Sequence, residues 1–318
     1  MRVIDYPDVT GGRKRHSRPT PLMGGIAVLV SLFLTAPIAF WASDPVPAQI
    51  GDVAAMALLI AVFALIGFID DREELSPKIR LVIMLLCAAF AVNNQPSLTV
   101  QFLHFEFSDR VFILGGWGAV FTVLSLVGLA NAVNMADGKN GLVIGMAIIW
   151  NAVLLFYGAP ILLPVLMVSL ACLIVVFIYN LRGKLFLGDT GSFGLACFFG
   201  TVAIYSYTHN FTRLPADMIV LFFMVPVVDC LRLMVARVLR GSSPFSAGRD
   251  HLHHHIAARM GWTKGLFVYQ SIIAVPIALH LLSSDFALLA VLLQFTGYCF
   301  TLSLCAYAGR GAASDAAA

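Results

Sequence analysis

Long apolar runs separated by short polar segments dominate this chain. Runs of about 17–25 residues, the length that crosses a bilayer as a helix, lie at 23–42, 52–69, 117–136, 141–157, 160–179, 192–208, 217–239, 265–283 and 286–306. A shorter run at 79–92 follows a basic segment and is counted as a tenth. We therefore predict an all-α, polytopic integral membrane protein with about ten transmembrane helices, in which residues 1–318 form a single transmembrane domain.

Composition supports this class and excludes others. Hydrophobic residues make up 60% of the 318 positions and charged residues only 12%, about half of the roughly 25% that is usual in a soluble domain. The net charge of +3 is too small for a nucleic-acid-binding surface, so no nucleic acid partner is expected. The six cysteines all fall inside apolar runs without a C-x-x-C pair, which predicts buried thiols rather than disulfides.

Lysines and arginines orient the predicted helices. If the N-terminus is cytoplasmic, the inner connections hold sixteen of the twenty basic residues and the outer loops hold only Arg110 and Arg213. Basic residues collect on the cytoplasmic side of membrane proteins, so we predict a multi-pass protein of the cytoplasmic membrane with this orientation. Residues 1–20 are polar and basic, unlike a cleavable signal peptide.

The inner connections also carry nearly every polar cluster, which predicts one cytoplasm-facing active site assembled at the helix ends. The clusters lie at 13–25, 67–81, 131–142, 186–192 and 243–256. The transporter or flippase alternative expects polar residues near the bilayer midplane and matching sequence halves, and neither is evident.

Two of these clusters are rich in carboxylates and amides. Asp70 and Asp71 end an apolar helix and suit a metal or a phosphate, although Arg72 could neutralise one of them in a solvated loop. Asn131, Asn134 and Asp137 recur every three residues, so they share one helix face; they suit magnesium and sugar hydroxyls, or amide pairing between helices.

The remaining clusters offer cations and a helix start. Lys78 and Arg80 follow the carboxylate pair, and Asp189 in the sequence GDTGS either caps the next helix or lies where its amides bind an anion. The predicted cytoplasmic loop 241–264 is rich in histidine. Its Arg249, His251, His253 and His254 suit a diphosphate clamp better than a zinc site, because no cysteine accompanies them. Asp229 and Arg232, three apart in one apolar run, are interpreted as a buried ion pair.

Six motifs in order resemble one family. They are Asp5-Tyr-Pro followed by RKRH, P-x-P-L-M-G-G-I, DD-x₃-L-S-x-K-x-R, N-A-x-N-x-x-D-G, G-D-x-G-S and SPFS-x₂-R-x-H-x-H-H, between residue 5 and about residue 262. Together they are similar to the bacterial polyprenyl-phosphate N-acetylhexosamine-1-phosphate transferases of glycosyltransferase family 4. The histidine motif is most similar to the branch that uses GlcNAc.

The resemblance implies a reaction: a UDP-N-acetylhexosamine and undecaprenyl phosphate give undecaprenyl diphosphate-GlcNAc and UMP, the first step of a lipid-linked polysaccharide such as O-antigen or lipopolysaccharide. It also implies Mg²⁺, with Mn²⁺ as a substitute. GalNAc, QuiNAc or FucNAc donors remain alternatives, and a homodimer remains open. The resemblance implies that Asp189 and Asn134 are metal ligands and that Asp137 supports the metal or the sugar. It implies that Asp70, supported by Asp71, orients or deprotonates the lipid phosphate. Substrate binding is implied for Lys78, Arg80, Asn131, Arg249, His251, His253 and His254.

Two features depart from the family pattern. The common D-G-x-D-G-L reads here Asp137-Gly-Lys-Asn140-Gly-Leu, so an essential carboxylate at the fourth position is in doubt. The family's Asp-x-Pro segment normally follows a first membrane helix, whereas four residues precede Asp5 here. We expect that helix to be encoded upstream; its loss is the alternative.

Overall fold

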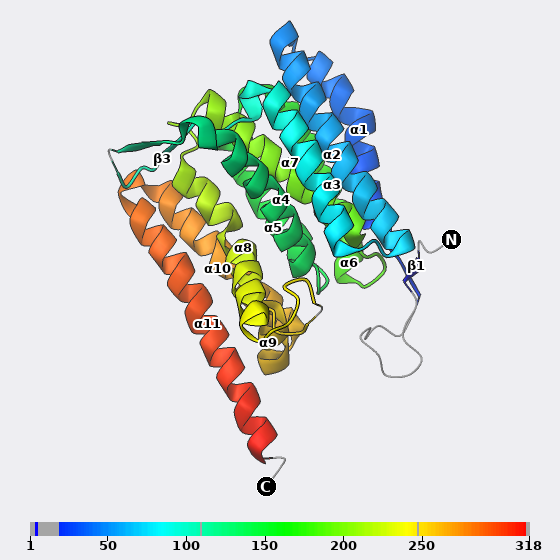
Figure 1. Ribbon diagram of the computed structural model, residues 1–318, viewed down its shortest axis with the longest axis vertical. Coiled ribbons are helices and arrows are strands. Elements are labelled where there is room, and N and C mark those ends of the chain that lie inside the picture. Colours follow the sequence, from blue (N-terminus) through cyan, green and yellow to red (C-terminus); the bar gives the residue numbers. More distant parts are fainter. Residues whose placement is uncertain (1–3, 6–18, 109, 247, 316–318) are drawn as a thin grey trace.

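The computed structural model describes residues 4–5, 19–108, 110–246 and 248–315, and these form a bundle of long helices (Figure 1). The helices are α1 Gly24–Trp41, α2 Pro47–Glu73, α3 Pro77–Asn94, α4 Gly118–Ala136, α5 Leu142–Tyr157, α6 Leu163–Leu181, α7 Gly188–His209, α8 Ala216–Leu239, α9 Leu252–Met260, α10 Trp262–Leu282 and α11 Ala287–Asp315. Four 3₁₀ turns (Pro96–Leu98, Gly115–Trp117, Pro160–Leu162, Ser284–Phe286) and two short strand pairs (β1 Ile4–Asp5 with β2 Thr20–Pro21, β3 Phe102–His104 with β4 Val111–Ile113) complete it. The predicted basic segment at 13–16 lies outside the described residues.

The all-α membrane class is confirmed, and each of the ten predicted apolar runs is a helix. Within the described residues, eight helices are long and apolar enough to cross a membrane. The two others are α5, which has only 16 residues, and the more polar α7. A helix buried among other helices does not need an apolar surface for lipid, because neighbouring side chains satisfy its polar groups.

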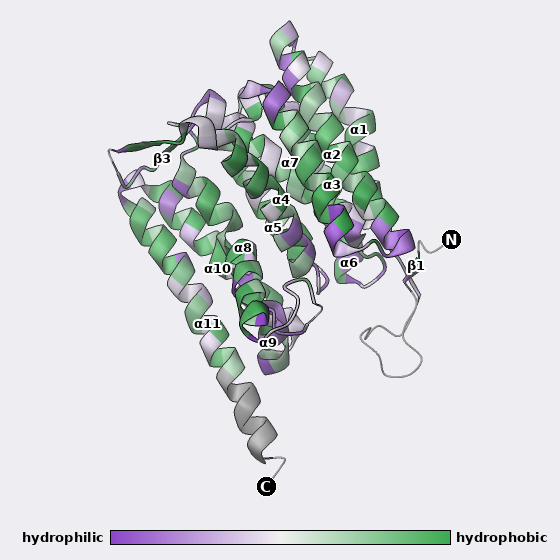
Figure 2. Cartoon of the chain, in the orientation of Figure 1, coloured by the Kyte–Doolittle hydropathy of each residue, from purple (hydrophilic) through white to green (hydrophobic). Residues whose placement is uncertain are grey.

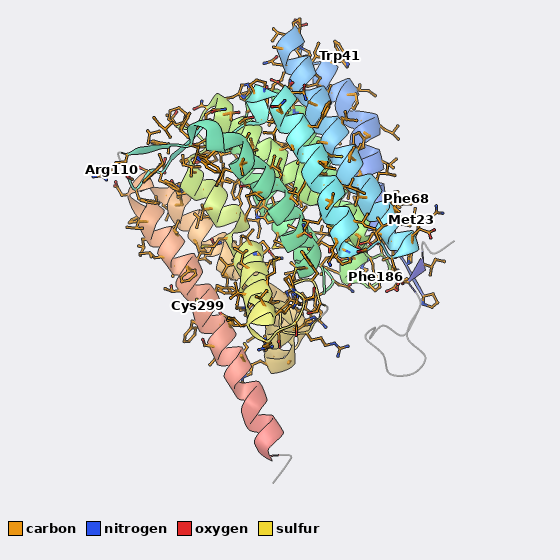
Figure 3. All side chains as sticks on the ribbon, in the orientation of Figure 1. Met23, Trp41, Phe68, Arg110, Phe186 and Cys299 are labelled. Carbon is orange, nitrogen blue, oxygen red and sulfur yellow. The ribbon has the colours of Figure 1, made fainter. Side chains whose placement is uncertain are left out.

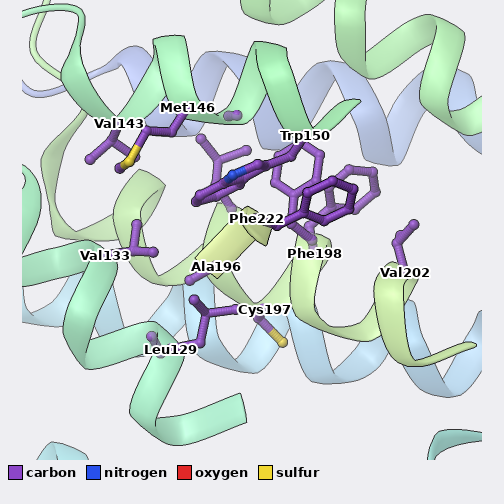
Figure 4. Packing of buried hydrophobic residues seen from close by; sticks show 14 of the residues in the cluster. Leu129, Val133, Val143, Met146, Trp150, Ala196, Cys197, Phe198, Val202 and Phe222 are labelled. Atoms are coloured by element: carbon purple, nitrogen blue, oxygen red, sulfur yellow. The ribbon is translucent and has the colours of Figure 1, made fainter. Parts of the chain in front are cut away.

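α7 is the central helix of the bundle. Its residues from Thr190 to Tyr207 are all buried, and α1, α2 and α4 pack around it. α2 approaches α7 so closely that a Cβ on Gly67 would overlap the carbonyl group of Asp189. Figure 4 shows the apolar packing along α7. The ring of Trp150 stands edge-on to that of Phe199, with ring centres 5.6 Å apart. This close packing fixes the start of α7 against the end of α2.

Two parts of the fold were not predicted. Residues 102–113 form the β3–β4 hairpin, and part of the predicted loop 241–264 forms the helix α9. α9 packs against α10 and α11, so its histidines stand on a fixed element. The six cysteines are free, and Cys197, Cys230 and Cys305 are buried, as the composition predicts for these three.

The bundle has two polar ends separated by apolar helix (Figure 2). Met23, Phe68 and Phe186 mark one end in Figure 3, and Arg110 marks the opposite one. We call the first the Asp189 end: the C-terminal ends of α2, α4 and α8, the N-terminal ends of α3 and α7, and α9. The second, the hairpin end, consists of β3–β4, the start of α8 and the end of α10.

Candidate active site

Asp71 joins the end of α2 to the start of α7. Its Oδ1 accepts the backbone N–H of Asp189 at 2.8 Å, and its Oδ2 accepts the N–H and hydroxyl of Thr190 at 3.0 and 2.8 Å. The first amides of a helix have no partner within that helix, and a carboxylate there is also favoured by the helix dipole. Asp71 therefore caps α7 from a different helix, and this contact positions Asp189.

Arg80 lies among the carboxylates. Its guanidinium is paired with the buried carboxylate of Asp70, and its Nη1 is 3.7 Å from Oδ2 of Asp189. The same guanidinium lies 5.5 Å from the centre of the Phe193 ring. Arg80 comes from the first turn of α3, so three elements, α2, α3 and α7, bring these charges together as the sequence predicted.

Asn134 and Asp189 are also in contact. The Asn134 amide donates to Oδ1 of Asp189 at 2.7 Å and to Oγ of Ser192 at 3.0 Å. The amide oxygen of Asn134 then remains as an acceptor or ligand atom. In contrast, Asn131 donates to the Val127 carbonyl of its own helix at 2.8 Å, so the structure does not link Asn131 to this group.

The loop after α4 connects the carboxylates to the histidines. Burial, and secondarily the charge of Asp71, raises the pKa of Asp137 to about 7. Next to it, a Cβ on Gly138 would overlap the imidazole of His253. The loop is fixed on its other side, because the Trp262 indole donates to the Asn140 carbonyl at 2.8 Å. His253 therefore lies directly against the acidic loop, although 115 positions separate them along the chain.

Asp229 organises the histidine segment. It forms the predicted ion pair with Arg232 at 2.9 Å, and it also accepts from Nδ1 of His251 at 2.9 Å and from the N–H of Leu252 at the start of α9. Tyr298 of α11 donates to the same carboxylate at 2.9 Å. Sequence reasoning identified the ion pair but missed this larger role. The available signal was a carboxylate inside an apolar run some twenty residues before four clustered histidines.

The rings of His253 and His254 lie beside each other, tilted by 51°, with ring centres 4.2 Å apart. Burial lowers the pKa of His253 well below its usual value, and burial together with the charges of His251 and Lys139 lowers that of His254 to about 4. Both rings are therefore neutral near pH 7. The Nε2 atom of His253 is buried without a hydrogen-bond partner, and such an atom is costly unless a ligand or water satisfies it.

The two other predicted cations lie at the edge of the site. Lys78 is exposed on the first turn of α3, and Arg249 is exposed in the segment before α9. Arg249 is close enough for its charge to contribute to the lowered pKa of His254. Both side chains are exposed to solvent.

The donor atoms suit a magnesium ion. Asp70, Asp71, Asp137 and Asp189 are carboxylates, Asn134 adds an amide oxygen, and Arg80 is the cation paired among them. These oxygens do not converge on one point as a complete ligand set. Mg²⁺ is usually held by one or two carboxylates while waters and substrate phosphates fill the other positions. An incomplete oxygen set beside an excess of carboxylates fits that chemistry.

Comparison with known proteins finds one family model and several relatives that match this chain. The family model for glycosyl transferase family 4 matches residues 53–207. The chain is 28% identical over 299 residues to the undecaprenyl-phosphate alpha-N-acetylglucosaminyl 1-phosphate transferase of Escherichia coli (strain K12), covering 89% of this chain and 75% of that protein.

Two further relatives have names that describe the same kind of transferase. The chain is 29% identical over 273 residues to the Yersinia pestis protein of the same name, covering 82% of this chain and 71% of that one. It is 26% identical over 263 residues to the probable undecaprenyl-phosphate N-acetylglucosaminyl 1-phosphate transferase of Bacillus subtilis (strain 168), covering 80% and 70%. The matched segment contains Asp70, Asp71, Asp137 and Asp189, whereas Asp229 and the histidines of α9 follow it.

Proposed function

We propose that this protein transfers N-acetylhexosamine-1-phosphate, with GlcNAc as the sugar, from a UDP-sugar to undecaprenyl phosphate. The observation that carries the proposal is the group at the start of α7, where Asp70, Arg80 and Asp189 meet beside Asn134. The relatives carry names that specify undecaprenyl phosphate and N-acetylglucosaminyl 1-phosphate transfer. The basic residues counted at this end of the helices favour a cytoplasmic site in a bacterial inner membrane.

In the proposed reaction an oxygen of the lipid phosphate attacks the phosphorus that bears the sugar. The bond from this phosphorus to the bridging oxygen of UMP breaks, and UMP leaves with both bonding electrons. A phosphate monoester has a second pKa near ~6, so at neutral pH the lipid phosphate is already an anion. Asp70 then has to hold and orient it through Arg80 more than to remove a proton.

The other residues bind the donor. Mg²⁺, held by Asp189 and Asn134 with Asp137 nearby, would offset the negative charge of the diphosphate. Arg80 and Lys78 supply positive charge to the phosphates. His253 and His254 are neutral, so they donate single hydrogen bonds to the nucleotide end, and Arg249 adds charge at the entrance. Asp71 keeps the α7 terminus in place.

The test uses purified protein in nanodiscs with undecaprenyl phosphate, Mg²⁺ and a radiolabelled UDP-sugar. We expect equal amounts of UMP and of a labelled lipid diphosphate, abolished by EDTA and restored by Mg²⁺ or Mn²⁺. UDP-GlcNAc, UDP-GalNAc and UDP-QuiNAc are compared in parallel, and preference for either of the latter two would change the assigned sugar. A transporter would leave the nucleotide intact, and that result would overturn the proposal.

A further inference from the structure

A second cluster of ionisable side chains lies at the hairpin end, far from the candidate active site along the helices (Figure 1). It consists of Glu106, which follows β3, Asp217 in the first turn of α8, and His280 in the last turn of α10. One ligand atom from each residue lies within 4.8 Å of the others, and no other such group of three forms within the described ranges of the chain. Three segments distant in sequence therefore converge on one small volume.

The separation between His280 and Glu106 suits two ligands of one metal ion, while His280 and Asp217 are in direct contact. Nε2 of His280 is 3.3 Å from Oε2 of Glu106 and is in contact with Oδ2 of Asp217. Metal–ligand bonds of about 2.0–2.2 Å in a tetrahedral zinc site place neighbouring donor atoms about 3.3 Å apart. Oε2 of Glu106 is buried and makes no hydrogen bond, to His280 or to any other described residue. This oxygen is therefore available as a ligand atom.

The surroundings orient the ligands. The other oxygen of Asp217, Oδ1, accepts the backbone N–H of Glu106 at 2.7 Å, which turns Oδ2 toward His280. Such an outer hydrogen bond fixes the ligand in metal sites. Asp217 is fully buried and His280 is 5% exposed, whereas the Glu106 side chain is 23% exposed. One ligand is thus open to solvent, which gives an ion a path to the site.

Charge also favours a cation. Two carboxylates face one imidazole, so the group carries a net negative charge in either protonation state of the histidine. His104, on the neighbouring β3, has a buried Nδ1 without a hydrogen-bond partner and adds a second imidazole close to Glu106.

We propose that Glu106, Asp217 and His280 bind a divalent transition-metal ion, with zinc as the best fit. One imidazole nitrogen with two carboxylate oxygens and an open fourth position matches the ligand types and geometry that zinc accepts. Bound there, the ion ties the β3–β4 hairpin to the ends of α8 and α10. It is a structural site, separate from the proposed transfer reaction and independent of it.

The decisive experiment measures metal content on untagged full-length protein, because a histidine tag would bind zinc itself. The protein is stripped with EDTA, exchanged into metal-free buffer, supplied with micromolar Zn²⁺, desalted and measured by mass spectrometry for zinc. We expect one zinc per chain, and a rise in the thermal midpoint on zinc addition. Zinc at background level in the wild type would overturn the proposal.

Variants locate the ion. Glu106→Gln and His280→Gln should each lower zinc affinity by more than about 100-fold, beyond the 10- to 100-fold cost of losing an outer partner. Asp285→Asn changes an exposed carboxylate at the same end and should retain zinc. His254→Gln and Asp189→Asn should also retain it, and loss of zinc in either would place the ion at the Asp189 end and refute the site.

A variant could lose zinc because it fails to fold, so one further measurement uses only the wild-type protein. Co²⁺ added to stripped wild-type protein should give the strong visible absorption of a four-coordinate site with nitrogen and oxygen ligands, and Zn²⁺ should displace it. A weak six-coordinate spectrum, or preference for Mn²⁺ or Ca²⁺ over Zn²⁺, would contradict the zinc assignment. Retention of one zinc by a correctly folded Glu106→Gln protein would contradict the ligand set.

Discussion

The two polar ends of this bundle arrange similar side chains in different ways. At the hairpin end, Glu106, Asp217 and His280 converge within 4.8 Å and exclude most water. At the Asp189 end, the carboxylates are divided between a helix cap, an ion pair and a loop, and the Asp189 side chain is 36% exposed. The first arrangement brings three ligand atoms together, whereas the second leaves its carboxylates apart from one another, as the proposed binding of a large anionic substrate would require.

This difference follows from the elements that supply the residues. At the Asp189 end, α7 is buried from Thr190 to Tyr207 and its first amides are capped by Asp71, while the Asp189 side chain is 36% exposed. A preorganised but incomplete site favours charge that appears only in the bound or transition state. At the hairpin end, the side chains of two helix ends and a hairpin contact one another directly, and Asp217 and His280 are buried.

The largest expected effect is that of Asp189→Asn. The change keeps the shape and the contact with Asn134 but removes the charge, so we expect kcat to fall on the order of 10²- to 10³-fold or more, as when a group that stabilises transition-state charge is lost. Membrane level and zinc content should stay normal. Activity near that of the wild type would refute Asp189 as a metal ligand. A loss of zinc would show that zinc binds at the Asp189 end and not at the hairpin end.

A smaller effect is expected from Gly138→Ala, which tests whether His253 belongs to the Asp189 end. The added methyl overlaps a ring that is 1% exposed and has little space to move, and overpacking of this kind costs about 1–3 kcal/mol. We expect kcat/KM for the UDP-sugar to fall about 10- to 100-fold. Gly128→Ala on the exposed face of α4, where a Cβ meets open space, is the matched control.

His253→Ala completes this test. It should raise KM or lower kcat without changing zinc content, and added to Gly138→Ala it should cause little further loss, because both changes act through one contact. Fully additive losses would show that Gly138 acts independently of His253.

The helices were predictable because a segment in lipid must satisfy its own backbone hydrogen bonds, and a long apolar run therefore has one available structure. The meeting of Asp70, Arg80 and Asp189 was predictable once basic residues oriented the helices. The Asp71 cap was not, because it depends on how closely α2 approaches α7 at Gly67. Nor was the Glu106, Asp217 and His280 group, whose members are single residues in three segments with no local pattern.

Asn140→Asp is expected to have little effect. The Asn140 contact with Trp262 uses the backbone carbonyl, so the side chain can change while the loop stays in place. An interaction between partly exposed charges is worth about 0–1 kcal/mol. The carboxylate added by this substitution should therefore leave kcat/KM within about five-fold of the wild type. Abolished activity would mean that the Asn140 amide makes a specific contact with the substrate, which Asn140→Ala would then also remove.

The smallest effect expected is on stability against acid, and it contrasts the histidines of the two ends. Burial lowers the pKa of His254 to about 4 from a usual 6.5, so the unfolded chain takes up a proton at this residue before the folded chain does. The stability that the folded protein gains while His254 is neutral in both states is present above pH 6.5 and is lost as the pH falls toward 4. At the hairpin end, His280 instead lies against the carboxylates of Glu106 and Asp217. The thermal midpoint of wild type should therefore fall more between pH 7.5 and 5 than that of His254→Gln, with a constant difference above pH 7. Because the His254 side chain is partly exposed, solvent screening keeps the difference small, and parallel curves over the whole range would show that His254 protonates equally in both states.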